Sequence, residues 1–555
     1  MFDFKGFIGA LLYTKSDDPV GNLKSATIWV QELPESDVQE AQDTIIKALG
    51  SINANKKTPL KERIQVLMYL DEKANALQET LCREYLQYAD NPEAPEKLFL
   101  PTILDFWEEM ADSYQYCIRE FTQNPTSKKI WEKLPLLTSR AIHYYAMQAK
   151  WSHIRYMPVE NHVWRNLHRL YLFAEREGFA QNALNLYPQS SEETTCASEY
   201  LQPLMLHLAN PESLLPKQIN MVDQWLDAWA KSITIEHEFR PHRQLYAVNL
   251  GDSKPGRKLR RNMIDAKYRY WGVGLLLVSI AKTLEKLKEG ELPIHLKLGE
   301  DCRLPVCLEL IQLLSDRWAG KGATRQHARL KTEKNLLVLQ GLEEILAQIK
   351  PGAKNKPVRA PSPELDSAEQ EIINYQLCIA PSTTPMDGNT TVMGEPELFE
   401  SPLHQWIQED ESESGCAAIL DTSRSSHLKI GTLIGLKPVD NKHFAIGVIR
   451  RLNKDISSKI RVGIQTLTQT PIAVELHAIT NGVVKKGVMD AVYLPESLTA
   501  NMLRSIIIPA RFYKRGQTLQ LKAQGKTYSI RLQQALEQTE DYARANFDVL
   551  AQHQL

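Results

Sequence analysis

The chain has 555 residues, with 66 basic and 67 acidic side chains and a net charge of −1. This length exceeds the usual size of one domain, so we expect at least two domains. The balanced charge excludes the overall basic field of a non-specific nucleic-acid binder, although it leaves room for a local basic pocket. A content of 43% hydrophobic and 24% charged residues is typical of globular proteins and excludes a fibrous or disordered chain.

Targeting signals are missing from the sequence. The longest apolar run, residues 271–281, is too short to span a bilayer, and the N-terminus lacks a basic leader and a cleavage site. These patterns predict a cytoplasmic protein without a membrane span. The seven cysteines are scattered, and Cys302 and Cys307 lack the spacing and the histidines of a zinc site. We therefore expect reduced, mostly buried thiols and no metal.

The first half of the chain, residues 1–317, is predicted to be a mostly helical domain. Apolar residues recur there with a period of 3.6, as at Leu60, Ile64 and Leu67. Helix-terminating pairs such as Asn124-Pro125 recur at intervals that suit antiparallel helix pairs. A pair of short β-strands at 244–250 and 292–298 is compatible with the sequence.

One helix of this half has a repeat-like pattern. Trp164, Leu167 and Tyr171 have the spacing of the first helix of a tetratricopeptide repeat, and Ala180 falls where the second helix needs a small residue. Only one partial copy is found, and the same spacing suits any apolar helix face. Helical-repeat-like hairpins and an ordinary helix face therefore both remain open.

The spacing of apolar residues changes from a helical to a strand-like pattern after Trp318. Short β-rich runs separated by turn residues predict an antiparallel barrel or sandwich over residues 318–537. A segment rich in Pro, Ser, Thr and acidic residues, at about 343–403, is expected to be a low-order insertion in this domain. Residues 538–555 are expected to form a C-terminal tail. The predicted fold class is multidomain α+β.

Enzyme motifs are absent or incomplete. The segment from Gly251 to Lys258 resembles a phosphate-binding loop, but Arg257 stands where the motif needs Lys. His237 and His242 are one residue too far apart for a zinc-protease helix. No nucleophile elbow and no glycine-rich dinucleotide motif occurs. The sequence therefore predicts a binding protein rather than an enzyme, with no cofactor.

A short polar signature lies at a boundary between two β-rich runs. Asp410 and Ser412 are two residues apart on an extended segment, so their side chains point to the same side of a sheet. Gly415 allows a tight turn or a close approach of the backbone to a ligand. Such an acid and hydroxyl can bind one planar group. A polar hairpin turn capped by the aspartate is the alternative.

A basic segment precedes the first β-rich run. Arg325 and Arg329 form an R-x-x-x-R motif among further Lys and His residues. The planar guanidinium group suits phosphate oxygens and the O6/N7 edge of guanine, and it stacks on bases. The spacing alone is unspecific, because two other R-x-x-x-R pairs occur in the helical half. Only this pair stands immediately before a predicted strand.

The order of these signatures resembles the PilZ domain, the bacterial receptor module for cyclic di-GMP. The resemblance covers roughly residues 318–536, and the helical half is similar to the N-terminal region of larger, type IV pilus-associated FimW-like receptors. The resemblance implies that Arg325 and Arg329 bind the phosphates and a guanine face. It implies that Asp410, Ser412 and Gly415 bind a guanine edge, and that the output is surface attachment or pilus-driven motility.

One feature departs from the PilZ pattern. About 80 residues separate the two motifs, where the family usually has one hairpin. The site survives if the intervening segment loops out, because the cost of loop closure grows slowly with length. A nucleotide-blind interaction scaffold with a degenerate PilZ-like barrel is the rival interpretation. Either interpretation implies an unidentified protein partner, such as pilus machinery, and no nucleic-acid polymer.

Overall fold

The computed structural model describes residues 19–321, 328–350 and 404–553, apart from short gaps at 35, 89–92, 126–127, 191, 422–427, 456, 458, 481–482, 497–503 and 524–525. The chain forms two compact units. The first comprises Met1–Glu333, Ile407–Thr432 and Val448–Gln465, and the second comprises Lys334–Trp406, Leu433–Gly447 and Thr466–Leu555.

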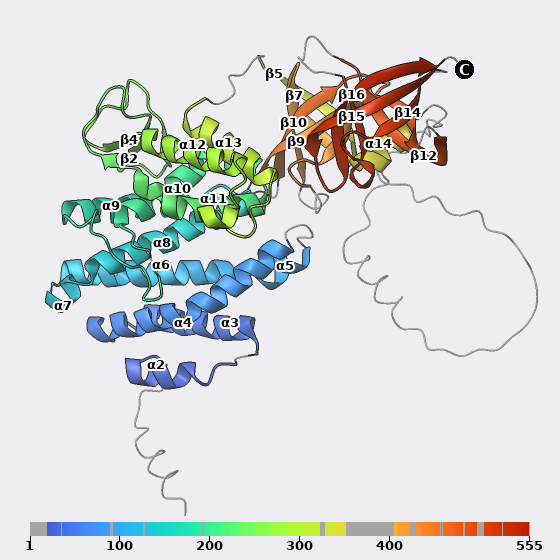
Figure 1. The fold of residues 1–555 in the computed structure, drawn as a ribbon. Helices are drawn as coiled ribbons and strands as arrows, with labels where there is room; N and C mark the ends of the chain where they lie inside the picture. The colour runs from blue at the N-terminus through green and yellow to red at the C-terminus, as the bar shows by residue number, and fades with distance from the viewer. Residues whose placement is uncertain are drawn as a thin grey trace, which may run out of the picture. The chain divides into compact units, whose positions relative to one another are not determined.

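The helices of the first unit pack in successive layers, with α3, α4, α6 and α8 followed by α9, α10 and α11 (Figure 1). Their bounds are α2 Leu23–Val30, α3 Val38–Ala54, α4 Leu60–Gln87, α5 Glu93–Leu98, α6 Leu100–Gln123, α7 Lys128–Trp131, α8 Leu134–Ile154, α9 Asn161–Arg176, α10 Cys196–Leu208, α11 Pro216–Trp229, α12 Gly274–Lys288 and α13 Val306–Trp318. Asp37 and Thr195 cap α3 and α10 by accepting backbone N–H bonds. Within the described ranges, no helix has the length and hydropathy needed to cross a membrane. The predicted helical half is confirmed.

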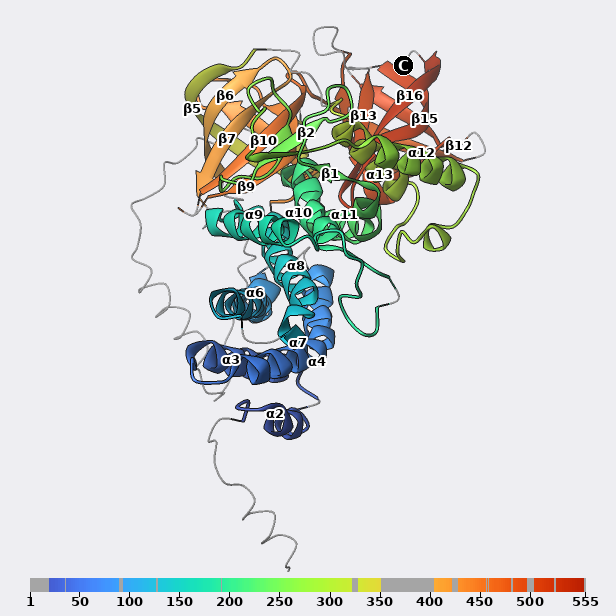
Figure 2. The same ribbon diagram turned by 90° about the vertical axis from the view of Figure 1, so that its left-hand side faces the viewer.

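A small sheet completes the helical region. Its strands β1 Ile235–Glu236, β2 Tyr246–Asn249, β3 Arg257–Lys258 and β4 Tyr268–Trp271 have the order β1-β4-β2-β3. In both views the sheet lies on the far side of α9 and α10 from α6 (Figures 1 and 2). The strand expected at 244–250 is confirmed as β2. The strand expected at 292–298 is wrong, because Pro293 opens a 3-10 helix that ends at Leu296.

A buried carboxylate holds three helices and a loop together. The Asp71 side chain of α4 is fully buried and accepts hydrogen bonds from the hydroxyls of Tyr114, Tyr144 and Tyr187. Arg140 of α8 donates to the same carboxylate at 3.1 Å. The carboxylate oxygens therefore accept four hydrogen bonds, and these compensate the buried negative charge within the helical core.

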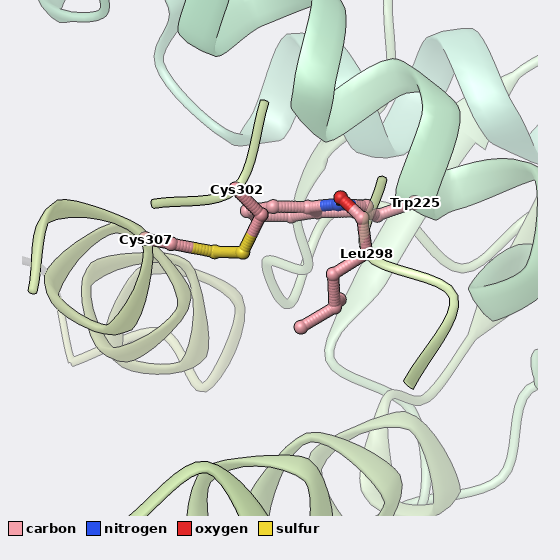
Figure 3. Close-up of a disulfide and its surroundings, with 4 residues drawn as sticks. All are labelled: Trp225, Leu298, Cys302 and Cys307. Atoms are coloured by element: carbon pink, nitrogen blue, oxygen red, sulfur yellow. A yellow bond between two sulfur atoms is a disulfide. The ribbon is translucent and has the colours of Figure 1, made fainter. Parts of the chain in front are cut away.

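The cysteine prediction needs one correction. Cys302 and Cys307 form a disulfide, whereas reduced thiols were expected throughout the chain. Figure 3 shows the disulfide beside Trp225 of α11, whose indole N–H donates to the Leu298 carbonyl at 2.9 Å. Both cysteines are buried. The spacing alone could not reveal the bond, because the contact depends on how the loop before α13 turns.

Two closed barrels follow the helices, where the sequence predicted one. The first has the strand order β10-β7-β6-β5-β8-β9, and the second has the order β11-β12-β13-β16-β15-β14. The strand bounds are β5 Leu330–Gln340, β6 His404–Ser412, β7 Gly415–Asp421, β8 Leu433–Pro438, β9 Ala445–Lys454, β10 Lys459–Thr468, β11 Ile472–Thr480, β12 Val483–Leu494, β13 Ser505–Pro509, β14 Thr518–Ala523, β15 Lys526–Gln538 and β16 Tyr542–His553. The predicted multidomain α+β class is confirmed.

Two boundaries differ from the sequence prediction. Strand β16 occupies most of the expected tail at 538–555, because its residues pair with β13 and β15 and close the second barrel. Residues 343–349, expected at the start of the insertion, belong to helix α14 (Gly341–Ile349), whose Leu342 and Ile345 are buried. The remainder of the predicted insertion, from residue 351 to 403, lies outside the described residues.

Candidate functional site

The two sequence signatures meet in the first barrel. Arg329, one residue before β5, donates from Nη1 to both carboxylate oxygens of Asp410 in β6, at 3.0 and 2.9 Å. The two residues are 81 positions apart in the chain and lie in the same compact unit. The Arg329 side chain is 36% exposed and that of Asp410 is 14% exposed, so the pair is open to solvent on one side. Arg325 lies outside the described residues.

A β-bulge determines which way Asp410 faces. The pairing of β6 with β7 shifts between Gln408 and Asp410, so that Gln408 pairs with Ala418 and Asp410 with Ala417. Gln408 is buried, whereas Asp410 is turned to the other face of the sheet. The backbone N–H of Ala417 also donates to the Asp410 carboxylate at 3.0 Å. The carboxylate is therefore fixed from two sides before any ligand arrives.

Ser412 and Gly415 close the hairpin that joins β6 to β7. They are cross-strand partners, and the Ser412 hydroxyl donates to the Gly415 carbonyl at 2.9 Å. A Cβ atom at Gly415 would lie 2.0 Å from the Ile464 carbonyl oxygen of β10. Glycine is thus required here for the close approach of two strands, a role that needs no ligand. Asp410 and Ser412 do share one face, as the sequence predicted.

Small residues lie between the polar groups on this face. Cross-strand pairing forms two rows, Asp410–Ala417–Gly463 and Ser412–Gly415–Gln465, across β6, β7 and β10. Opposed residues of antiparallel strands project from the same face. The rows therefore form a surface with polar groups at its edges, where Ala417 is buried and the Arg451 side chain lies against Gly463. We name this surface the β6–β7–β10 shelf.

Sequence reasoning missed two residues at the edge of this shelf. Arg450 of β9 donates from Nε to the Gln465 amide oxygen at 2.8 Å. This contact brings a second guanidinium group to the row that contains Ser412. Both residues lie in predicted β-rich runs, but neither belongs to a motif with known spacing. Their proximity follows from strand order, which the sequence pattern does not reveal.

The Cys416 thiol beside Asp410 is not an activated nucleophile. Burial, together with the nearby Asp410 carboxylate, raises the pKa of the Cys416 thiol to about 12. The thiol is therefore protonated at neutral pH and inert. No cluster of three potential metal ligands occurs in the part of the chain that the structure describes. The arrangement is suited to binding a planar, anionic ligand by hydrogen bonds and charge.

Fold and site together define a class of protein, in which a helical domain precedes two six-stranded barrels and the first barrel has an Arg–Asp shelf. Comparison with known proteins identifies a family within this class. Residues 24–241 match the family described as "Cyclic-di-GMP receptor FimW, N-terminal domain", and residues 475–550 match "FimW C-terminal beta-barrel domain". The chain belongs to the FimW family.

A curated relative agrees with this assignment. The chain is 19% identical to the cyclic-di-GMP receptor FimW of Pseudomonas aeruginosa over 535 residues, which cover 91% of this chain and 86% of the relative. No solved structure matches the chain. The two family matches cover the helical domain and the second barrel, so Arg329, Asp410, Ser412 and Gly415 all lie between them. The structure, rather than the family matches, therefore defines the candidate site.

Proposed function

We propose that this protein is a cyclic di-GMP receptor that binds its ligand on the β6–β7–β10 shelf, in the manner of a PilZ domain. The observation that carries the proposal is the contact of the Arg329 guanidinium with both carboxylate oxygens of Asp410, across 81 residues of chain. The naming of its relative as a cyclic-di-GMP receptor supports the same ligand. The protein acts as a binding protein and not as a catalyst.

Each polar group has a role that follows from its chemistry. The Arg329 guanidinium binds a phosphate oxygen or the O6/N7 edge of guanine. The Asp410 carboxylate accepts hydrogen bonds from the N–H groups on the opposite edge of a guanine. Ala417 is buried and the Arg451 side chain lies against Gly463, so a base that lies between the polar groups has to displace Arg451. The resemblance to the PilZ pattern assigns the phosphates to Arg325 as well.

The ion pair in the ligand-free protein does not prevent binding. A pair in which one side chain is 36% exposed contributes at most about 1 kcal/mol, because water screens it. A ligand with two phosphates and two guanines offers both partners stronger, multiple contacts. Arg329 can therefore exchange Asp410 for a phosphate while Asp410 keeps its bond from the Ala417 N–H.

The binding signal then reaches a protein partner. Ligand contacts at Arg329 and Asp410 change how the helical domain is presented. By its resemblance to type IV pilus-associated receptors, the protein acts in surface attachment or pilus-driven motility, with an unidentified protein partner. The nucleotide-blind scaffold is the competing function, and ligand titration separates the two.

Isothermal titration of the full chain with cyclic di-GMP tests the proposal. We expect Arg329→Gln and Asp410→Asn each to weaken binding about 10- to 100-fold, which corresponds to about 1.4–2.8 kcal/mol. Asn keeps an oxygen for the Ala417 N–H, so the fold is preserved. Arg240→Gln is the matched control, because Arg240 pairs with Glu236 at 3.3 Å, is half-exposed and belongs to no strand of the barrels.

The outcomes distinguish the rival functions. Unchanged affinity in both site variants would place the ligand elsewhere on the protein. An unmodified chain that releases no heat and gains no thermal stability with cyclic di-GMP would favour the nucleotide-blind scaffold. Because the contacts include phosphates, the affinity should also fall as the salt concentration rises.

A further inference from the structure

The small sheet of the first compact unit and its loops are strongly basic. Residues 235–271 include nine Arg and Lys and four Asp and Glu, a net charge of +5 in a chain whose net charge is −1. Four of these basic residues lie toward one end of the sheet, namely Arg243 before β2, Lys258 at the end of β3, and Arg260 and Arg261 after it. All four are exposed, and none pairs with a carboxylate in the part of the chain that the structure describes. We name these four residues the basic end of the sheet.

Backbone contacts place the basic end beside the start of α12. The Leu259 N–H donates to the Leu245 carbonyl at 2.9 Å, which joins the segment after β3 to the segment before β2. The Leu245 N–H donates in turn to the carbonyl of Trp271, the last residue of β4, at 2.9 Å. A Cβ atom at Gly272 would lie 2.1 Å from the Arg243 carbonyl oxygen, so the chain that leads into α12 passes directly beside Arg243. Both views show the small sheet next to α12 and α13 (Figures 1 and 2).

The first two turns of α12 present apolar side chains to solvent. At 72%, Leu275 is the most exposed large apolar side chain in the described part of the chain, and Val278 is 53% exposed. The buried side of the helix packs into the core through Leu276 and Ile280. Because residues three positions apart share a helix face, Leu275 and Val278 form one apolar surface next to the basic end.

This combination of charge and apolar surface suits an anionic bilayer. Lys and Arg are attracted to anionic headgroups, and exposed apolar side chains beside them enter the interface between headgroups and acyl chains. Single-stranded nucleic acid matches the surface less well, because it stacks its bases on exposed aromatic rings. Tyr246, Tyr270 and Trp271 of the sheet are all buried. A nucleic-acid duplex would leave Leu275 and Val278 without a partner.

We propose that the basic end of the sheet and the first two turns of α12 together dock the protein on an anionic lipid bilayer. The four cations bind headgroup phosphates, and Leu275 and Val278 enter the interface. The contact is peripheral and reversible, because two apolar side chains bury too little surface for a stable anchor. The proposal depends neither on the shelf nor on cyclic di-GMP, since none of these residues belongs to a barrel strand.

Co-sedimentation of the full chain with lipid vesicles tests the charged part of this surface. We expect binding to phosphatidylcholine vesicles that contain about 30% phosphatidylglycerol, and binding at least about tenfold weaker to phosphatidylcholine alone. The double variant Arg260→Gln/Arg261→Gln should weaken binding to the anionic vesicles about tenfold. The matched control is Arg511→Gln/Arg515→Gln, which makes the same charge change at exposed positions outside this surface. Salt at about 0.5 M should release the unmodified protein.

A valine substitution tests the apolar part. Val278→Ser should weaken binding to the anionic vesicles about threefold, because serine gains little on entering the interface. Val488→Ser is its matched control, since Val488 of β12 is 60% exposed and lies outside this surface. We expect the control to bind like the unmodified chain and all variants to keep the thermal unfolding midpoint of that chain.

The other possible outcomes would overturn the proposal. Equal binding to charged and uncharged vesicles, or unchanged binding in Arg260→Gln/Arg261→Gln, would show that the basic end does not dock on lipid. An equal loss in Arg511→Gln/Arg515→Gln would show attraction by overall charge and no defined surface. A single-stranded RNA oligonucleotide or a polyglutamate peptide that binds more tightly than the vesicles, and is released by the Arg260→Gln/Arg261→Gln change, would assign the surface to nucleic acid or to an acidic protein. No sedimentation at about 1 mM accessible anionic lipid would refute docking outright.

Discussion

Gly415→Ala is the sharpest structural test of the shelf. The added Cβ would lie 2.0 Å from the Ile464 carbonyl oxygen and 3.1 Å from its carbon, and both atoms belong to the backbone. A normal contact needs the strands to separate by more than about 1 Å, because a backbone cannot move aside like a flexible side chain. The separation would break the ladder where Gly415 pairs with Gln465. Overpacking of this kind costs about 3 kcal/mol.

Amide hydrogen exchange measures this loss of stability in the affected strands. A local loss of about 3 kcal/mol should speed amide exchange in β7 and β10 about a hundredfold. Gly463→Ala is the matched comparison, since its Cβ would lie 3.1 Å from Arg451 Cβ, a much longer contact than the 2.0 Å at Gly415. We expect its exchange to change less than about tenfold. Equal protection in Gly415→Ala and in the unmodified chain would refute the close approach of these strands.

Three further outcomes follow from the structure. Asp71→Asn should lower the free energy of unfolding of the helical domain by about 3 kcal/mol, measured by urea denaturation, because it removes the fully buried carboxylate that pairs with Arg140 and leaves only the partly exposed Glu72 as its counter-charge; an unchanged midpoint would contradict this. Burial would lower the pKa of His143, but the Glu199 carboxylate at 3.2 Å outweighs it and raises the pKa above 6.5. This pair therefore stabilises the fold fully below pH 6.5, and the stabilisation should fall as pH rises through the raised pKa of His143. His143→Gln should remove this pH dependence from thermal unfolding curves. Alkylation of the denatured, unreduced chain should leave Cys302 and Cys307 unmodified by mass spectrometry, and their modification would contradict the disulfide.

Local signals in the sequence predicted much of the fold. The 3.6-residue period identified the helical half, and Trp164, Leu167 and Tyr171 are all buried on one face of α9. The short β-rich runs identified most strands of the first barrel. Strand β16 was missed because its place in the second barrel depends on pairing with β13 and β15, which the sequence pattern does not reveal. A division into two barrels depends on which distant strands pair, and periodicity does not contain that information.

The candidate site was predicted in part. Asp410, Ser412 and Arg329 were identified by type, order and neighbouring strands, and the structure brings them into one barrel. The bulge before Asp410 could not be read from the sequence, since it arises from a mismatch between two paired strands. Arg450 and Gln465 were missed for a similar reason, because their contact joins neighbouring strands at a position that no motif marks.

Strand β9 has a mechanical consequence for the protein. Arg450 contacts the shelf through Gln465, and four residues later the Lys454 N–H donates to the Tyr156 carbonyl of the helical domain at 2.8 Å. An extended strand covers that interval in about 13 Å and resists compression along its length. One continuous strand therefore joins the shelf to the helical domain, with no loop between the two contacts.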